Sequence, residues 1–161
     1  MPIVQTIVDE LQREADTTQR ILERVPQDKL DWRPHAKSKS IGELAYHIAA
    51  LPSLGVMVLR HDELDPRTRP PVPRDLPPAG VFRRNVDQFL SAIGPMDNNQ
   101  MMQPFTFHFG DKVIAEAPKA GMIRNLLLNH TYHHRGQLSV YLRLLDVPVP
   151  SVYGPTADEG I

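Results

Sequence analysis

Apolar residues recur at helical spacing in four stretches of this chain, and prolines lie at or just beyond the ends of these stretches. The stretches cover residues 2–25, 40–62, 78–93 and 119–145. Proline disrupts a helix interior because it lacks the backbone N–H, so the 16 prolines should lie mainly in connections. Pro52 is the exception, and we expect it to kink the second helix. The pattern predicts an all-α fold, a four-helix bundle formed by a single domain that spans the whole chain.

The connections between the predicted helices are of two kinds. Residues 65–80 contain six prolines and few apolar residues, which predicts a long Pro-rich crossover rather than a helix or strand. Residues 105–114 alternate around a Gly-Asp turn, which predicts a short β-hairpin. Ser40 and Glu43 have the spacing of a capping box, so the second helix should begin at this point.

Charge and composition argue against several kinds of partner. The formal net charge is −1 and the basic residues form no long block, so we expect no nucleic-acid partner. The chain contains no cysteine, so any metal must be held by His, Asp, Glu or water. Residues 1–5 lack the features of a signal peptide, and no segment approaches the ~20 apolar residues that span a bilayer. We therefore expect a cytoplasmic protein with no membrane partner.

Three histidines have positions typical of a metal site. His130 and His134 are four residues apart in the last predicted helix, so both imidazoles can reach one ion from one helix face. His47 lies near the buried boundary of the second predicted helix and can supply a third nitrogen. Burying imidazoles among Leu and Ile without a partner costs free energy. We therefore predict a divalent-metal site, in which three protein ligands leave the open coordination position of a catalytic centre.

The other four histidines are weaker candidates. His133 competes with His134, since positions 130 and 133 also share a helix face, but the apolar stripe runs closer to His134. The remaining three are His35, His61 and His108. They fall in predicted loops or helix ends and should be solvated, although His61 or His108 could border a cleft.

Polar residues beside the predicted ligands have alternative roles. Gln137 is a candidate hydrogen-bond partner of a metal-binding imidazole. Arg135 is expected to be a salt-bridging residue on the surface. Glu43 lies one helical turn before His47 and could orient a ligand or move a proton, but its capping role explains it without a part in the site.

The residues around the histidine pair argue against two familiar classes of metalloenzyme. No Glu follows His130, so the zinc-protease motif with its adjacent general base is absent from the sequence. The Glu-x-x-His motifs that di-iron bundles carry on paired helices are also absent. Imidazole suits Zn, Ni, Fe and Cu, so the ligand set alone leaves the metal open.

Three blocks of the chain resemble the DinB/YfiT-like superfamily. They are Trp32-Arg33-Pro34, the Gly-Glu-Leu-x-x-His-Ile pattern within residues 40–49, and the His-x-x-x-His-Arg-Gly-Gln pattern within residues 129–138. The resemblance implies an up-down-down-up four-helix bundle, often dimeric, that binds a divalent ion such as Ni or Zn through three histidines. Matched residue by residue, those histidines are His47, His130 and His134.

The resemblance also implies an activity. Characterised members include thiol-dependent transferases and isomerases that use low-molecular-weight thiols such as mycothiol or bacillithiol. We expect a homodimeric enzyme whose metal centre activates such a thiol, or water, for transfer to a small electrophilic substrate. The alternative is a non-catalytic bundle that binds a metal for stability or as a sensor. The residues assign no catalytic side chain beyond the predicted ligands, and the crossover and hairpin lie outside the shared motifs, which leaves the substrate open.

Overall fold

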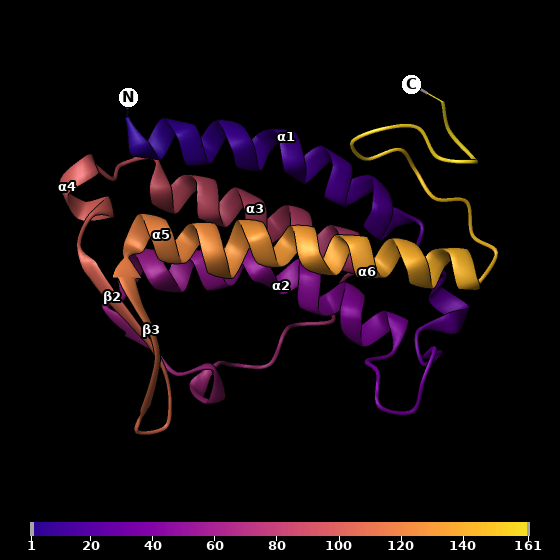
Figure 1. The fold of residues 1–161 in the computed structure, drawn as a ribbon, viewed down its shortest axis with the longest axis horizontal. Helices are drawn as coiled ribbons and strands as arrows, with labels where there is room; N and C mark the ends of the chain where they lie inside the picture. Colours follow the sequence, from indigo (N-terminus) through magenta and orange to yellow (C-terminus); the bar gives the residue numbers. More distant parts are fainter. Residues whose placement is uncertain (1, 161) are drawn as a thin grey trace.

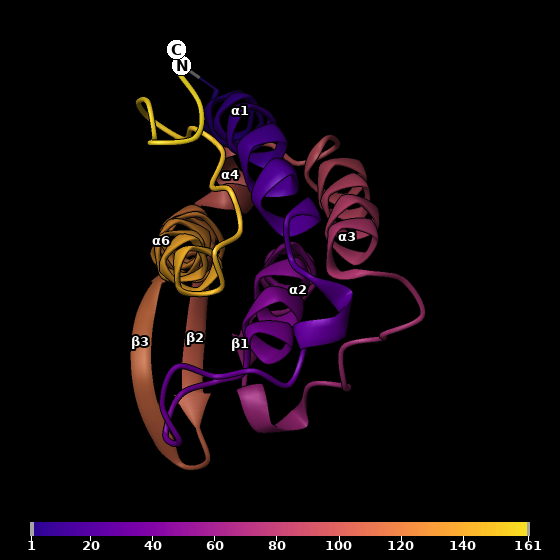
Figure 2. The same cartoon turned by 90° about the vertical axis from the view of Figure 1, so that its right-hand side faces the viewer.

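The computed structural model describes residues 2–160 and contains four long helices packed as a bundle (Figure 1). α2 and α3 run antiparallel to α1, and α6 returns in the direction of α1, which gives the expected up-down-down-up order (Figure 1). Both α1 and α2 pack against α3 and α6, as the view along the bundle shows (Figure 2). The long helices are α1 (Ile3–Glu23), α2 (Ile41–Arg60), α3 (Pro78–Ile93) and α6 (His130–Leu144).

The last predicted helix, residues 119–145, is continuous but irregular. It consists of α5 (Lys119–Ile123), a π-helical segment (Arg124–Asn129) and α6. Segments of π-helix often lie at functional sites, and this one ends directly before His130. Apolar spacing predicts the extent of the helix but does not reveal the wider turns within it.

The start of α2 follows from two side chains. The backbone N–H of Glu43 donates to Ser40 Oγ at 3.1 Å, and the backbone N–H of Ser40 donates to Glu43 Oε2 at 2.6 Å. The predicted capping box is therefore present, and it occupies the Glu43 carboxylate. Pro52 lies inside the helix, where it is buried.

The expectation that no segment could span a bilayer is wrong for α2. By length and composition alone, Ile41–Arg60 is apolar enough to cross a membrane, although 72% of its apolar window is buried inside the protein. The reason is its position in the bundle: α2 packs against both α3 and α6, and 14 of its 20 residues are buried. A helix that is covered on most sides is apolar on most sides.

A glycine allows α2 to approach its neighbours closely. A Cβ at Gly55 would lie 2.7 Å from the ring of Phe89 in α3 and 3.0 Å from Leu127 in the π-helical segment. Phe89 and Leu127 both belong to the buried core. Close packing at this point therefore depends on the missing side chain, since protein interiors are as densely packed as organic crystals.

A small sheet lies at one end of the bundle (Figure 1). β2 (Pro104–Phe109) and β3 (Lys112–Pro118) form the predicted hairpin, and β1 (Glu63–Leu64) pairs parallel to β2. β1 was not predicted, because two residues are too few to establish an alternating pattern. The short helix α4 (Asn98–Met101) connects α3 to β2, and 3₁₀ turns occupy Gln27–Lys29 and Pro66–Thr68.

Asp65 connects the start of the crossover to the hairpin. Its carboxylate accepts hydrogen bonds from the Arg67 guanidinium at 2.6 Å and from the backbone N–H of Gly110 at 3.0 Å. The bonds from Arg67 hold the pKa of Asp65 well below its usual range. Gly110 has φ 62°, a conformation that glycine adopts without strain. The backbone conformation of the turn therefore favours glycine at this position.

The prediction that Arg135 lies on the surface is wrong. Its side chain is 2% exposed and forms an ion pair with Glu14 of α1 at 2.7 Å. It also donates to Thr18 Oγ1 at 3.1 Å and to the Tyr153 hydroxyl at 2.6 Å. The predicted ion pair exists, but it lies between helices, because position 135 of α6 faces α1 rather than solvent. Burial without these partners would be costly for a guanidinium.

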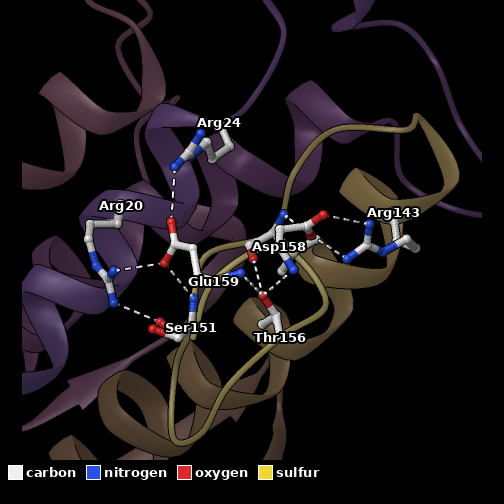
Figure 3. Close-up of polar contacts among 8 residues, drawn as sticks. Arg20, Arg24, Arg143, Ser151, Thr156, Asp158 and Glu159 are labelled. Atoms are coloured by element: carbon white, nitrogen blue, oxygen red, sulfur yellow. Dashed lines mark hydrogen bonds and ion pairs between the residues drawn. The ribbon is translucent and has the colours of Figure 1, made fainter. Parts of the chain in front are cut away.

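The C-terminal segment is held by acidic residues (Figure 3). Glu159 pairs with Arg20 and Arg24 of α1, and Asp158 pairs with Arg143 of α6. The carboxylate of Asp158 also accepts from the backbone N–H of Val149 at 2.9 Å. The segment therefore bridges the two helices that Arg135 joins further inside.

We expect Gly55→Ala to destabilise the protein by about 1–3 kcal/mol, since the added methyl overpacks the contact with Phe89 and Leu127. The matched control is Gly136→Ala in α6, where an added Cβ meets nothing within 4 Å. Alanine is the better helix former, so this variant should gain about 0.5–1 kcal/mol. Urea unfolding of both variants measures the difference, and equal stabilities would contradict the packing argument.

Candidate metal centre

Three imidazoles from two helices meet within the bundle. His47 Nε2, from α2, lies 3.1 Å from His130 Nε2, and His130 Nε2 lies 3.0 Å from His134 Nε2. One nitrogen from each ring lies within 4.8 Å of the other two. All three side chains are half-buried. The structure thus brings together the three histidines that the sequence predicts as ligands, while His133, one position before His134, is exposed.

The partners of the outer ring nitrogens decide which nitrogens carry protons. Gln137 Nε2 donates to the Tyr141 hydroxyl at 3.3 Å, which leaves its Oε1 to accept from His134 Nδ1 at 2.9 Å. The backbone of Leu126 favours a protonated nitrogen on the His130 ring, against the larger effect of burial, which lowers the pKa of His130. With Nδ1 as the protonated nitrogen of both rings, the facing Nε2 atoms carry lone pairs.

Two lone pairs that face one another at 3.0 Å repel unless a cation lies between them. Imidazole nitrogens bound to an ion at ~2.1 Å are about 3.0–3.4 Å apart when the angle at the metal is about 90–110°. The observed separations of 3.0 and 3.1 Å match the lower part of that range. The residues present therefore fit a divalent ion held by His47, His130 and His134.

The electrostatic surroundings keep these histidines neutral. Burial lowers the pKa of His47 to about 3, with a further contribution from His134 and His130. Burial also lowers the pKa of His130 to about 4, and it lowers the pKa of His134. A metal ligand must be unprotonated, so the site needs no deprotonation step at neutral pH before it can bind an ion.

A cleft opens beside His47. It has a volume of about 530 Å³ and lies between residues 33–39, the first two turns of α2 and residues 71–74 of the crossover. Besides His47, its wall includes Tyr46 and the capping residue Glu43. The volume falls within the range of small-molecule sites. Access of a small molecule to the histidine cluster is therefore possible from this side.

The remaining sequence candidates lie in three different environments. Gln137 contacts His134, as predicted for a hydrogen-bond partner. His35 and His61 are exposed, as predicted. His108 lies on β2 rather than in a loop and is half-buried, and together with His61 it borders a separate cleft of about 260 Å³.

Two residues near the centre were not selected from the sequence. Tyr141 accepts a hydrogen bond from the side chain of Gln137. Its position four residues after Gln137, on the same helix face, could have identified it from the sequence. Arg69 lies in the crossover, and its charge lowers the pKa of both His47 and His130. No spacing rule could have identified Arg69, because the crossover has no periodic structure.

A family model described as the DinB family matches residues 1–160. The chain is also 26% identical over 149 residues to the Bacillus subtilis (strain 168) protein named "Uncharacterized protein YrdA", an alignment that covers 91% of this chain and 85% of that protein.

Solved structures share the fold at low sequence identity. A DinB-like protein from Bacillus subtilis has a TM-score of 0.71 and 16% identity, with coverage of 97% of this chain and 99% of that one. A DinB-like protein from Bacillus cereus ATCC 10987 has a TM-score of 0.70 and 21% identity, with coverage of 92% and 97%.

We expect the metal-free protein to lose stability as the pH falls from about 6.5 towards 4. The unfolded chain protonates these histidines near the ordinary pKa of 6.5, whereas the folded chain protonates His47 only near 3 and His130 near 4. Protons therefore bind the unfolded state preferentially over this interval, and the stability is fully present only above it. Thermal unfolding in chelator at several pH values measures the effect.

The matched variants for that measurement are His47→Gln and His61→Gln. The first removes a half-buried imidazole whose pKa is lowered and should make the fall in Tm with acid shallower. The second removes an exposed one and should leave the fall unchanged. The same pH dependence in His47→Gln as in the unmodified protein would show that the histidine cluster does not cause it.

Proposed function

The chain belongs to the DinB family, and we propose that it is a metal-dependent enzyme that transfers a low-molecular-weight thiol, or water, to a small electrophilic substrate. The proposed ligands are His47, His130 and His134, and the proposed ion is Ni or Zn. The observation that carries the proposal is that the three-histidine cluster borders an open cleft through His47. A closed structural site would have its ligands covered on all sides.

The protein's own residues would hold and orient the reacting groups. Gln137 accepts from His134 Nδ1 and so directs Nε2 towards the other two imidazoles. Tyr141 holds Gln137, and the ring of Trp32 packs edge-on against Tyr141 with centroids 5.8 Å apart. When bound, a divalent ion supplies Lewis acidity, which lowers the pKa of a thiol or water at neutral pH. The cleft beside His47 would admit the substrate.

The second candidate function is a non-catalytic, metal-stabilised bundle. One observation favours it: the histidines come from α2 and α6, so a bound ion would cross-link two helices that are distant in the sequence. Ligands of that kind stabilise the folded state by mass action. The open cleft favours the enzyme over this alternative.

We further propose that the protein is a cytoplasmic homodimer that acts on a small molecule. The outer face of α6 supports a self-association surface, since Val140 and Leu144 are each 57% exposed there. Exposed apolar side chains in neighbouring turns favour contact with another protein surface.

Metal content tests the ligand assignment. Untagged protein should contain about one divalent ion per chain by elemental analysis, and His134→Ala should contain almost none, since two imidazoles bind far more weakly than three. The matched control is His133→Ala, which removes the exposed neighbouring imidazole and should keep full occupancy. Full occupancy in His134→Ala, or loss in both variants, would contradict the assignment.

Turnover distinguishes the two candidate functions. The metal-loaded protein should accelerate the reaction of 1-chloro-2,4-dinitrobenzene or a similar electrophile with one thiol of a panel that includes cysteine, and a chelator should remove this activity. His134→Ala should lose the activity, whereas His133→Ala should keep it. A large fall in Tm on chelation with no turnover across the panel would favour the metal-stabilised bundle.

A further inference from the structure

Basic side chains surround the cleft beside His47. Four of them line it: Arg33, Lys37, Lys39 and Arg74. The carboxylate in its wall is Glu43, which already accepts from the Ser40 backbone N–H and lies 3.7 Å from Arg33. Lys37, Lys39 and Arg74 form no ion pair with any residue between positions 2 and 160. The cleft therefore carries an excess of positive charge.

Arg69 adds a fifth cation, in the wall of an adjoining cleft that shares Pro71 and Val72 with this one. Its side chain is half-buried, and burial lowers its pKa. Within the described part of the chain, its guanidinium has neither an ion-pair partner nor a hydrogen-bond acceptor. Its charge nevertheless acts on both His47 and His130. Removing a guanidinium from water without an anion costs free energy, which distinguishes Arg69 from an ordinary solvated arginine.

Arg74 is held in position by an aromatic ring. Its guanidinium carbon lies 4.9 Å from the centroid of Tyr46, and the Tyr46 hydroxyl donates to the backbone carbonyl of Leu76 at 3.0 Å. Tyr46 is itself buried in α2, so the stacking surface is fixed. A guanidinium fixed in this way presents a planar set of donors that matches the two oxygens of a carboxylate or phosphate.

We infer that this cleft binds the oxyanion group, a carboxylate or phosphate, of a small molecule through Arg74 and Lys39, with Arg69 contributing its charge from the adjoining cleft. That this molecule is the substrate rests on the proposed function, whereas the binding of the oxyanion does not. Lys39, Arg74 and His47 line the same cleft, so one ligand can contact both the cations and the histidine cluster. The ligand would thus present its anionic group to the cations and its reactive group to the histidines.

Calorimetric titration of the metal-loaded protein with succinate, inorganic phosphate and the neutral isostere succinamide tests the inference. At least one of the two anions should bind, at least tenfold more tightly than succinamide, and the stronger of the two identifies the type of oxyanion. Arg69→Gln and Arg74→Gln should each weaken that binding about tenfold or more, as expected for loss of a charged hydrogen bond. Arg69→Lys should retain part of the affinity.

The matched control is Arg83→Gln, an exposed arginine of α3 that lines a different pocket, and it should bind like the unmodified protein. His134→Ala should keep the preference for the anion, which separates binding by the arginines from binding to the ion. Elemental analysis of Arg69→Gln should show unchanged metal content, so that failure of the metal assignment and failure of this inference are distinct results. Equal affinity for succinate and succinamide, or full affinity in folded Arg69→Gln, would overturn the inference.

Discussion

The packing of α2 between α3 and α6 is the contact on which the other features of this protein depend. Gly55 allows Phe89 and Leu127 to lie against the α2 backbone, and this closeness sets the distance between α2 and the last helix. His47 on α2 can reach His130 and His134 only at that distance. The hydrophobic effect that buries α2 therefore also assembles the polar centre.

Burial has opposite consequences for the polar groups within the bundle. For the three histidines it favours the neutral form, in which imidazole is ready to bind a metal. Arg135 is more deeply buried than the histidines, and Glu14, Thr18 and Tyr153 surround its guanidinium with a carboxylate and two hydroxyl oxygens. Among residues 2–160, no carboxylate pairs with the histidine cluster, so its facing lone pairs would accommodate a bound cation.

Arg135 and Arg69 differ in their partners, and this difference suits them to different roles. Arg135 is almost fully buried and fully partnered, and it joins α6 to α1 and to the C-terminal segment. Arg69 is half-buried and, among residues 2–160, has no partner. The first arrangement stabilises the bundle. The second leaves a cation near the candidate centre, where an anionic ligand can pair with it.

Local spacing is enough to predict the four helices, the hairpin and the choice of the three histidines, whereas the up-down-down-up order followed from the family resemblance. Periodicity of 3.6 residues places positions 130 and 134 on one face, and the Ser40–Glu43 pair marks the start of α2. Only the folded chain shows that Arg135 is buried, where the two residues of β1 pair, and that the crossover brings the charge of Arg69 within range of His47 and His130. These outcomes depend on contacts between segments far apart in the chain, and local spacing carries no information about such contacts.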